Sequence, residues 1–296
     1  MARKIAICVG QDKYATTTNI SSLNGCVNDA ILIGVMLRFA GFQEIRQIHN
    51  EAATQEGILR RLTSEIAKLR KGDYFVFWNS SHGYQVQDRN GDELLDGCDE
   101  AICTYDNDPR NPLTDDKFAG ILSRANPEAF IFFGSDSCHS GTLTKDVQKV
   151  HSQGSARLWI PPQDILFRSG QAIIDLKRYI EGFKQEAPSL ASNELCPRRF
   201  GRLASRQSAN MNHVLLSGCK ADEISWDAHF SQGYHGAMTY HFSMAVLQAW
   251  NERRSITYRD AHAVAMQGLR KDKFEQTPQL EGPNRLTDTP VFGFNP

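Results

Sequence analysis

A cysteine and a histidine each follow an apolar run of the sequence by a few residues. Residues 129–133 (AFIFF) precede Cys138, and residues 74–78 (YFVFW) precede His82. If the two runs are neighbouring parallel strands, the thiol and the imidazole emerge at the same edge of the sheet. A thiol beside an imidazole forms a nucleophile and its base, and the backbone N–H groups of Gly83 and Cys138 could hold an oxyanion.

Each of the two residues also has a structural interpretation. Free cysteine is among the most buried residue types, and an isolated histidine is more often structural than catalytic. The glycine-containing turn that follows each of them favours catalysis, because glycine lets a backbone N–H point into the site.

The elements that must position these residues follow an alternating pattern. Short apolar runs alternate with segments of helical periodicity, which is typical of parallel strands joined by crossover helices. An acidic, glycine-rich loop is predicted over 87–97. Strands are predicted over residues 4–9, 44–49, 74–78, 100–105, 129–133 and 213–217, and helices over 29–40, 54–69, 115–123, 171–183, 237–250 and 258–269. The sequence therefore predicts an α/β fold with a mostly parallel sheet.

Composition excludes several classes of protein. The chain has 296 residues, of which 41% are hydrophobic and 23% charged, so disordered and fibrous classes are excluded. The formal net charge of -1 gives no reason to expect nucleic acid or a membrane surface as partner. No apolar run reaches the roughly 18 to 20 residues that span a bilayer, and the first residues do not resemble a secretory signal, so a cytoplasmic location is expected. The seven cysteines are odd in number and lack a CxxC pair, which favours reduced thiols.

Taken together, the motifs resemble those of the metacaspases, which are clan CD, family C14 cysteine peptidases with a caspase-like fold, and in particular the prokaryotic or type I-like members. The resemblance leaves out residues 145–210 and rests on these segments: 23–30 (LNGCVNDA), 80–83 (SSHG), 96–102 (DGCDEAI), 113–116 (LTDD), 136–141 (DSCHSG), 217–222 (SGCKAD), 236–239 (GAMT) and 276–282 (QTPQLEG).

The resemblance implies one caspase-like domain over residues 1–296, built as a three-layer sandwich with helices on both sides of the sheet. Its parts would be a large-subunit-like half (1–144), an insertion or linker (145–211) and a small-subunit-like half (212–296). A monomer is expected.

The resemblance further implies hydrolysis of peptide bonds after Arg or Lys. Cys138 would be the nucleophile and His82 the proton donor and acceptor, with Gly83 and Cys138 as oxyanion donors. Asp29 and Asp136 could face one pocket, and paired carboxylates suit a cationic side chain. As alternatives, Asp29 could cap a helix and Asp136 could form a turn. The resemblance adds Cys26 and Ser80 to the lining of this pocket.

Acidic residues between the two motifs raise the question of a metal. The segment from Asp88 does not fit an EF-hand, because Gly91 occupies the fourth place of such a loop. The resemblance implies activation by Ca²⁺, and carboxylates suit this ion. Its ligands would be Asp99, Asp115, Asp116 and Asp146; a solvated acidic loop is the alternative. No organic cofactor is expected.

The basic insertion is a third functional candidate. An enzyme that cuts after Arg or Lys would find substrates in it, with Lys177-Arg178 or Arg198-Arg199 as candidate maturation sites. A solubilising linker or a lid over the site is the alternative. For the whole protein, the expected partners are proteins or peptides with a basic residue before the cut; the alternative function is that of a non-catalytic or partner-activated interaction protein.

Overall fold

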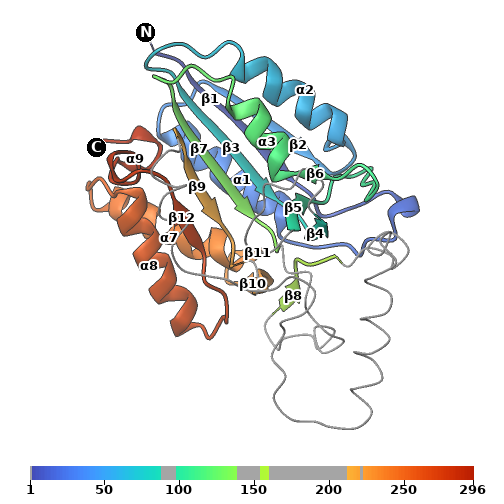
Figure 1. Cartoon of the computed structure of the whole chain (residues 1–296). Coiled ribbons are helices and arrows are strands. Elements are labelled where there is room, and N and C mark those ends of the chain that lie inside the picture. Colours follow the sequence, from blue (N-terminus) through green and yellow to red (C-terminus); the bar gives the residue numbers. More distant parts are fainter. Residues whose placement is uncertain (1, 88–97, 139–153, 160–211, 221–222) are drawn as a thin grey trace.

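The computed structural model describes residues 2–87, 98–138, 154–159, 212–220 and 223–296 (Figure 1). Its centre is a six-stranded sheet of order β12-β9-β7-β3-β1-β2. Every neighbouring pair is parallel except β12 with β9. The strands are β1 (Lys4–Gly10), β2 (Glu44–His49), β3 (Tyr74–Ser80), β7 (Phe130–Asp136), β9 (Val214–Ser217) and β12 (Gln279–Glu281). The predicted α/β fold with a mostly parallel sheet is confirmed.

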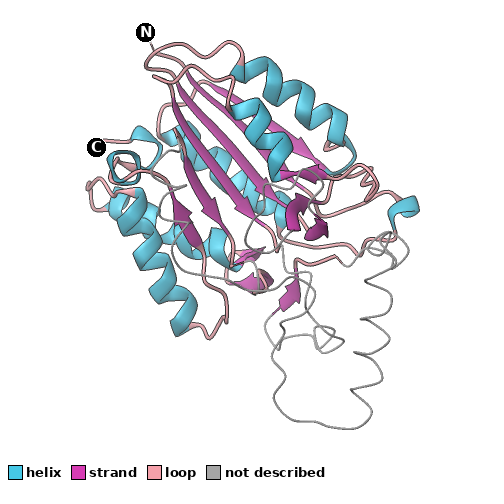
Figure 2. Ribbon diagram, viewed as in Figure 1, coloured by secondary structure: helices cyan, strands magenta, loops and turns pink. Residues whose placement is uncertain are grey.

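Helices cover both faces of this sheet (Figure 2). Side chains on β1 alternate between the faces: Ala6 and Cys8 pack into one hydrophobic cluster, and Ile5 and Ile7 into the other. The inner strands β1, β3 and β7 are largely apolar because both of their faces are buried, whereas the edge strand β2 (EIRQIH) is mostly polar and partly exposed. The first cluster includes side chains of α1 (Cys26–Phe39), α7 (Ala237–Asn251) and α8 (Tyr258–Lys271); the second includes side chains of α2 (Gln55–Ile66) and α3 (Asp115–Leu122).

Two small antiparallel sheets complete the fold. One contains β4 (Gly83–Gln87), β5 (Cys98–Ile102) and β6 (Leu113–Thr114), and the other contains β8 (Gly154–Ala156), β10 (Trp226–Phe230) and β11 (Gly233–Gly236). In Figure 1, β8 lies next to β10, at the end of the central sheet toward which β7 and β9 point. Short helices are α9 (Asn284–Thr287), η1 (Thr16–Thr18), η2 (Asn50–Ala52) and η4 (Val291–Gly293).

The predicted elements and the observed ones differ mainly at their ends. The six predicted strands and five of the predicted helices are present; the predicted helix over 171–183 lies outside the described residues, as does nearly all of the predicted loop over 87–97. The strands β4, β6, β8, β10, β11 and β12 were not predicted, because such short strands depend on their tertiary partners. Among the described residues, no helix combines the length and apolar character needed to cross a bilayer.

Candidate active site

The structure brings Cys138 and His82 to the same edge of the central sheet. Strands β3 and β7 are paired in parallel, with Ser80 opposite Asp136. His82 and Cys138 each lie two residues beyond that pair, at the carboxyl ends of the strands, where open α/β sheets bind ligands. Both side chains are buried.

The hydrogen bonds of His82 define which of its nitrogens accepts a proton. Nε2 lies 3.0 Å from the carbonyl oxygen of Ser21. Since a carbonyl only accepts, Nε2 carries the hydrogen, and Nδ1 has a free lone pair. Nδ1 has no hydrogen-bond partner within the described part of the chain. Burial lowers the pKa of His82 to about 4, so the imidazole is neutral at pH 7 and able to act as a base.

Neighbouring residues hold both His82 and Cys138 in place. The hydroxyl of Tyr14 accepts a hydrogen bond from the backbone N–H of His82 at 2.9 Å, and the centroids of the Tyr14 and His82 rings lie 5.5 Å apart. The sulfur of Cys138 accepts the N–H of Ser225 at 2.7 Å and lies 3.2 Å from the Ser225 carbonyl oxygen. A hydrogen bond to Cys138, together with burial, raises the pKa of the Cys219 thiol well above its usual value, so a second thiol adjoins Cys138.

An arginine of the predicted insertion fills this site. Arg157, which directly follows β8, is fully buried. Its carbonyl oxygen accepts the N–H of Gly83 at 3.0 Å and that of Cys138 at 3.3 Å, and its own N–H donates to the Ser225 carbonyl at 3.0 Å. The two N–H groups expected to hold an oxyanion therefore converge on one carbonyl group of the chain itself.

The guanidinium of Arg157 lies among three buried carboxylates. Nη2 is 2.8 Å from Asp29 Oδ2 and 2.9 Å from Asp227 Oδ1. Nη1 is 3.1 Å from the carbonyl oxygen of Asp136 and 3.5 Å from its Oδ2. Burial by itself would lower the pKa of Arg157, but the surrounding acidic groups outweigh it and keep the arginine charged. Burial raises the pKa of Asp29, and the positive charge of Arg157 opposes that shift.

Asp29 does not cap a helix. The helix α1 begins at Cys26, not at residue 29, so Asp29 is its fourth residue and the prediction that it opens the helix is wrong. Its Oδ1 accepts hydrogen bonds from His235 Nδ1 at 3.0 Å and from the N–H of Gly236 at 3.1 Å. The carboxylate thus joins α1 to β11 and faces Arg157 between them.

Asp136 does not form a turn either. It is the last residue of β7, and its buried carboxylate accepts hydrogen bonds from the N–H of Thr239 at 2.9 Å, from the Thr239 hydroxyl at 2.6 Å and from the Ser225 hydroxyl. The carboxylate of Asp227 is also held by a backbone donor: its Oδ1 faces Arg157, and its Oδ2 accepts the N–H of Asn24 at 2.8 Å. These donors orient the carboxylates toward Arg157.

Cys26 and Ser80 were expected to line the same pocket. Cys26 is buried at the start of α1, and burial raises the pKa of its thiol, which is therefore neutral. Ser80 is buried opposite Asp136, and its hydroxyl accepts a hydrogen bond from the indole of Trp78 at 3.1 Å. That contact anchors Ser80 to the core of the sheet.

The carboxylates expected to bind calcium lie in the small sheet β4-β5-β6 and in the helix that follows it. Asp99 is in β5, and Asp115 and Asp116 form the first turn of α3; the N–H of Glu100 donates to Asp115 Oδ1 at 3.2 Å. Asp146 lies outside the described residues. Among the residues that are described, no three His, Cys, Asp or Glu side chains are grouped closely enough to hold a metal ion. Since Asp146 lies outside the described residues, the calcium site stays a prediction.

Sequence reasoning missed Arg157, Asp227 and Ser225. Arg157 is one of many basic residues in the insertion, and no local signal distinguishes it. Asp227 lies within the unpredicted strand β10, 70 residues from Arg157. The candidate cleavage sites Lys177-Arg178 and Arg198-Arg199 lie outside the described residues. In the part of the insertion that is described, the chain does not form an exposed linker, because it occupies the site.

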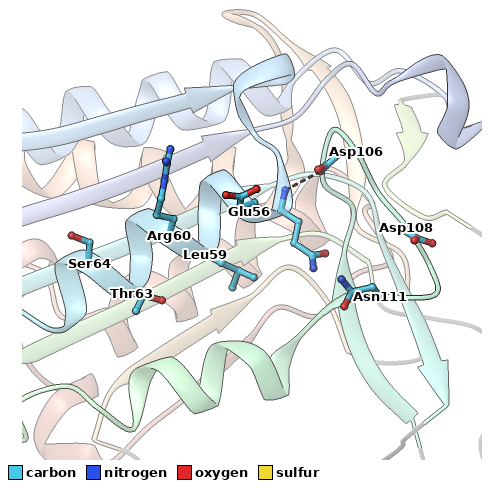
Figure 3. A pocket seen from close by; sticks show the side chains of 9 residues that line it. Glu56, Leu59, Arg60, Thr63, Ser64, Asp106, Asp108 and Asn111 are labelled. Carbon is cyan, nitrogen blue, oxygen red and sulfur yellow. Dashed lines mark hydrogen bonds between the residues drawn. The ribbon is translucent and has the colours of Figure 1, made fainter.

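A surface hollow elsewhere on the molecule does not belong to this site (Figure 3). It lies between α2 and the segment after β5, where the N–H of Gln55 donates to Asp106 at 2.8 Å. None of the residues predicted to act in catalysis lines this hollow. Its lining consists of Gln55, Glu56, Leu59, Arg60, Thr63, Ser64, Asp106, Asp108 and Asn111.

Known proteins share this fold and much of this sequence pattern. Residues 3–288 match the caspase domain of the peptidase C14 family. The chain is 27% identical over 301 residues to Metacaspase-1 of Meyerozyma guilliermondii, covering 94% of this chain and 69% of that protein. It is 26% identical over 300 residues to Metacaspase-1 of Schizosaccharomyces pombe, covering 94% and 67%. It thus spans about two thirds of the length of these relatives. The crystal structure of a Geobacter sulfurreducens protein is similar in fold, with 24% identity, a TM-score of 0.66 and coverage of 99% of this chain and 100% of that chain.

Proposed function

The chain belongs to the caspase domain family of cysteine peptidases, and on that premise we propose that it is an endopeptidase that cleaves after Arg or Lys with Cys138 and His82 as its dyad. The observation that carries the proposal is the position of Arg157. Its side chain pairs with buried carboxylates while its carbonyl oxygen accepts hydrogen bonds from Gly83 and Cys138. This is the arrangement that a substrate needs for attack on the bond after a basic residue.

The proposed reaction proceeds through a thioester. The sulfur of Cys138 leaves its hydrogen bonds with Ser225 and attacks the carbonyl carbon, while its proton passes to Nδ1 of His82. The N–H groups of Gly83 and Cys138 hold the oxyanion. His82 then gives the proton to the leaving amine and accepts one from the water that hydrolyses the thioester. The new carboxylate departs and the thiol is restored.

The pocket geometry favours arginine over lysine. Nη2 of Arg157 bridges Asp29 and Asp227, and Nη1 reaches Asp136. A lysine ammonium is a point charge on a flexible stem and cannot reproduce this fork. Losing one charge-assisted hydrogen bond costs about 1.5 kcal/mol or more, which corresponds to about tenfold in rate.

Cleavage of short fluorogenic peptides tests the proposal. Peptides ending in Arg, Lys or Asp before the fluorophore are given to the purified chain and to Cys138→Ala. We expect cleavage after Arg, about tenfold slower cleavage after Lys and none after Asp, with all activity lost in the variant. Cleavage after Asp would contradict the assignment of the acidic pocket. Silence on every peptide, in a folded and reduced sample, would favour a partner-activated or non-catalytic protein.

We also propose that calcium raises this activity. The supporting observation is that Asp99, Asp115 and Asp116 lie on neighbouring elements and offer only oxygen ligands, which suit Ca²⁺. In the Arg peptide assay, rates in calcium are compared with rates in EGTA. Equal rates would remove calcium from the proposed function.

The chain is further proposed to be its own first substrate, with the cut between Arg157 and Leu158. Arg157 already lies in the acidic pocket, and the amide that follows it is next to the oxyanion donors. Such a cut falls inside the basic insertion. It forms a new carboxylate at residue 157 and a new amine at residue 158.

The rate of this self-cleavage is expected to depend on the protonation of His82. Burial lowers the pKa of His82 from 6.5 to about 4, and only the neutral imidazole accepts the thiol proton. As pH falls, activity should therefore persist below 6.5 and be lost as pH passes through about 4. Gel-based rates from pH 8 to pH 4, with circular dichroism as a check on folding, measure this. Half-loss near pH 6.5 would mean that the imidazole is not buried in the reacting state.

A further inference from the structure

The segment over residues 154–159 crosses the whole site in an extended conformation. Before Arg157, β8 pairs with β10 in antiparallel register, with Ala156 opposite Trp226. After Arg157, Leu158 forms a parallel bridge with Gly83, and the N–H of Trp159 donates to the Gly83 carbonyl at 3.0 Å. Backbone contacts therefore fix the chain on both sides of the bond after Arg157.

The side chain of Trp159 has a site of its own. It is 9% exposed, and its ring stands edge-on to that of Tyr84, with centroids 5.0 Å apart and an interplanar angle of 88°. Trp159, Tyr84, Val86, Ala101 and Cys103 form a separate hydrophobic cluster, against which Tyr14 and Ile20 pack. This cluster is not part of the two large cores of the molecule.

We propose that Tyr84, Val86, Ala101 and Cys103 form a subsite that takes an aromatic side chain at the second residue after the scissile bond. The inference rests on the proposed endopeptidase function and adds to it a preference on the leaving side of the substrate. The second residue after the cut is Trp159 in the chain itself, and an equivalent aromatic residue would occupy this position in other substrates.

The secondary structure around the subsite explains its shape. Tyr84 and Val86 are two residues apart on β4, so their side chains lie on the same face. Ala101 is opposite Tyr84 on β5, and its small side chain, like that of Cys103, leaves room for a large ring. The hydroxyl of Tyr84 donates to Asn107 Oδ1 at 3.2 Å, which holds the tyrosine ring in place. Edge-to-face aromatic pairs add to the gain from apolar burial.

The subsite for the aromatic ring is linked directly to the proposed catalytic residues. Gly83 provides an oxyanion donor through its N–H and binds the backbone of Trp159 through its carbonyl. The carbonyl of His82 accepts the N–H of Cys103, at 2.8 Å, so a wall of the subsite is attached to the base. An aromatic ring in the subsite therefore holds the leaving segment in register with the dyad.

Internally quenched peptides of the sequence Gly-Ser-Ala-Arg-Leu-X test the inference, with X as Trp, Phe or Ala. Only the last residue differs, and the enzyme is the purified full chain, so folding is unaffected. We expect kcat/KM to be about tenfold higher with Trp than with Ala, and Phe to be close to Trp. In Tyr84→Ala the ratio of Trp to Ala should fall toward one. Phe39→Ala, an exposed aromatic residue at the far end of α1, serves as the matched control and should keep the ratio.

The outcomes separate the subsite from the function on which it rests. Equal kcat/KM for the Trp and Ala peptides, with cleavage still after Arg and still dependent on Cys138, would overturn the subsite alone. A Trp preference that survives in Tyr84→Ala would also overturn it, because the preference would then arise elsewhere. Absence of cleavage of all three peptides would overturn the proposed function and the subsite together.

Discussion

A chain carrying Arg157→Gln is expected to lose the cut between Arg157 and Leu158 completely. Glutamine is neutral, so the pocket formed by Asp29, Asp136 and Asp227 no longer attracts the side chain, and the carbonyl group is no longer held at the oxyanion donors. In wild type, incubation should yield a fragment whose first residue is Leu158. Mass spectrometry and N-terminal sequencing of the products over time measure this difference.

Further variants separate loss of the cut from loss of the fold. Breaking a buried ion pair costs about 3 to 5 kcal/mol, so Arg157→Gln must be checked by circular dichroism. Leu158→Pro keeps Arg157 in its pocket but turns the scissile bond into a tertiary amide, and it should also remain uncut. Arg157→Lys retains the charge and should be cut slowly. Arg198→Gln is the matched control and should be cut like wild type. If the cut were lost in Arg198→Gln and kept in Arg157→Gln, the maturation bond would follow Arg198.

Asp227→Asn is expected to lower kcat/KM on an Arg peptide by about 10² to 10³, because a buried carboxylate that meets a guanidinium contributes about 3 to 4 kcal/mol. The substitution keeps the shape of the side chain, and its amide oxygen can still accept the N–H of Asn24. The charge that faces Nη2 of the arginine is lost. Asp29 then remains as the other carboxylate at Nη2.

The measurement for this pocket is kcat/KM on Arg and Lys peptides for wild type and variant. Asp288→Asn is a suitable control, because Asp288 is an exposed partner of Arg259 at the surface. It should leave both values unchanged. If Asp227→Asn cleaved the Arg peptide as fast as wild type, Asp227 would have no part in recognition, and the pocket would be formed by Asp29 and Asp136 alone.

The position of Arg157 also has a consequence for regulation of the proposed activity. The groups that would recognise a substrate are engaged by the chain itself: the guanidinium fills the acidic pocket and the carbonyl meets both oxyanion donors. Another substrate can bind only after residues 154–159 leave. Cleavage after Arg157 would remove the covalent link across the site, which gives self-processing a physical role in activation.

Much of the fold, and the meeting of His82 and Cys138 at one edge of the sheet, could be predicted from local patterns in the sequence. Apolar runs such as 74–78 and 129–133 form buried strands because both of their faces are covered, and His82 and Cys138 lie two residues beyond the paired ends of those strands. The resemblance to metacaspases, read from motif order, is confirmed by the family match over residues 3–288.

Only the tertiary structure identified the groups that complete the site. Arg157 looks like any basic residue of the insertion, and its selection depends on β8 pairing with β10, whose sequences are far apart. Asp227 and Trp159 are likewise held by residues far away in the sequence, namely Asn24 and Tyr84. Local patterns predict the longer helices and six of the strands, whereas the short strands and the pocket form where distant segments meet. For that reason local patterns were enough to predict the fold class and the meeting of His82 and Cys138 at one edge of the sheet, whereas the placement of Arg157 in the pocket depends on pairing between distant strands.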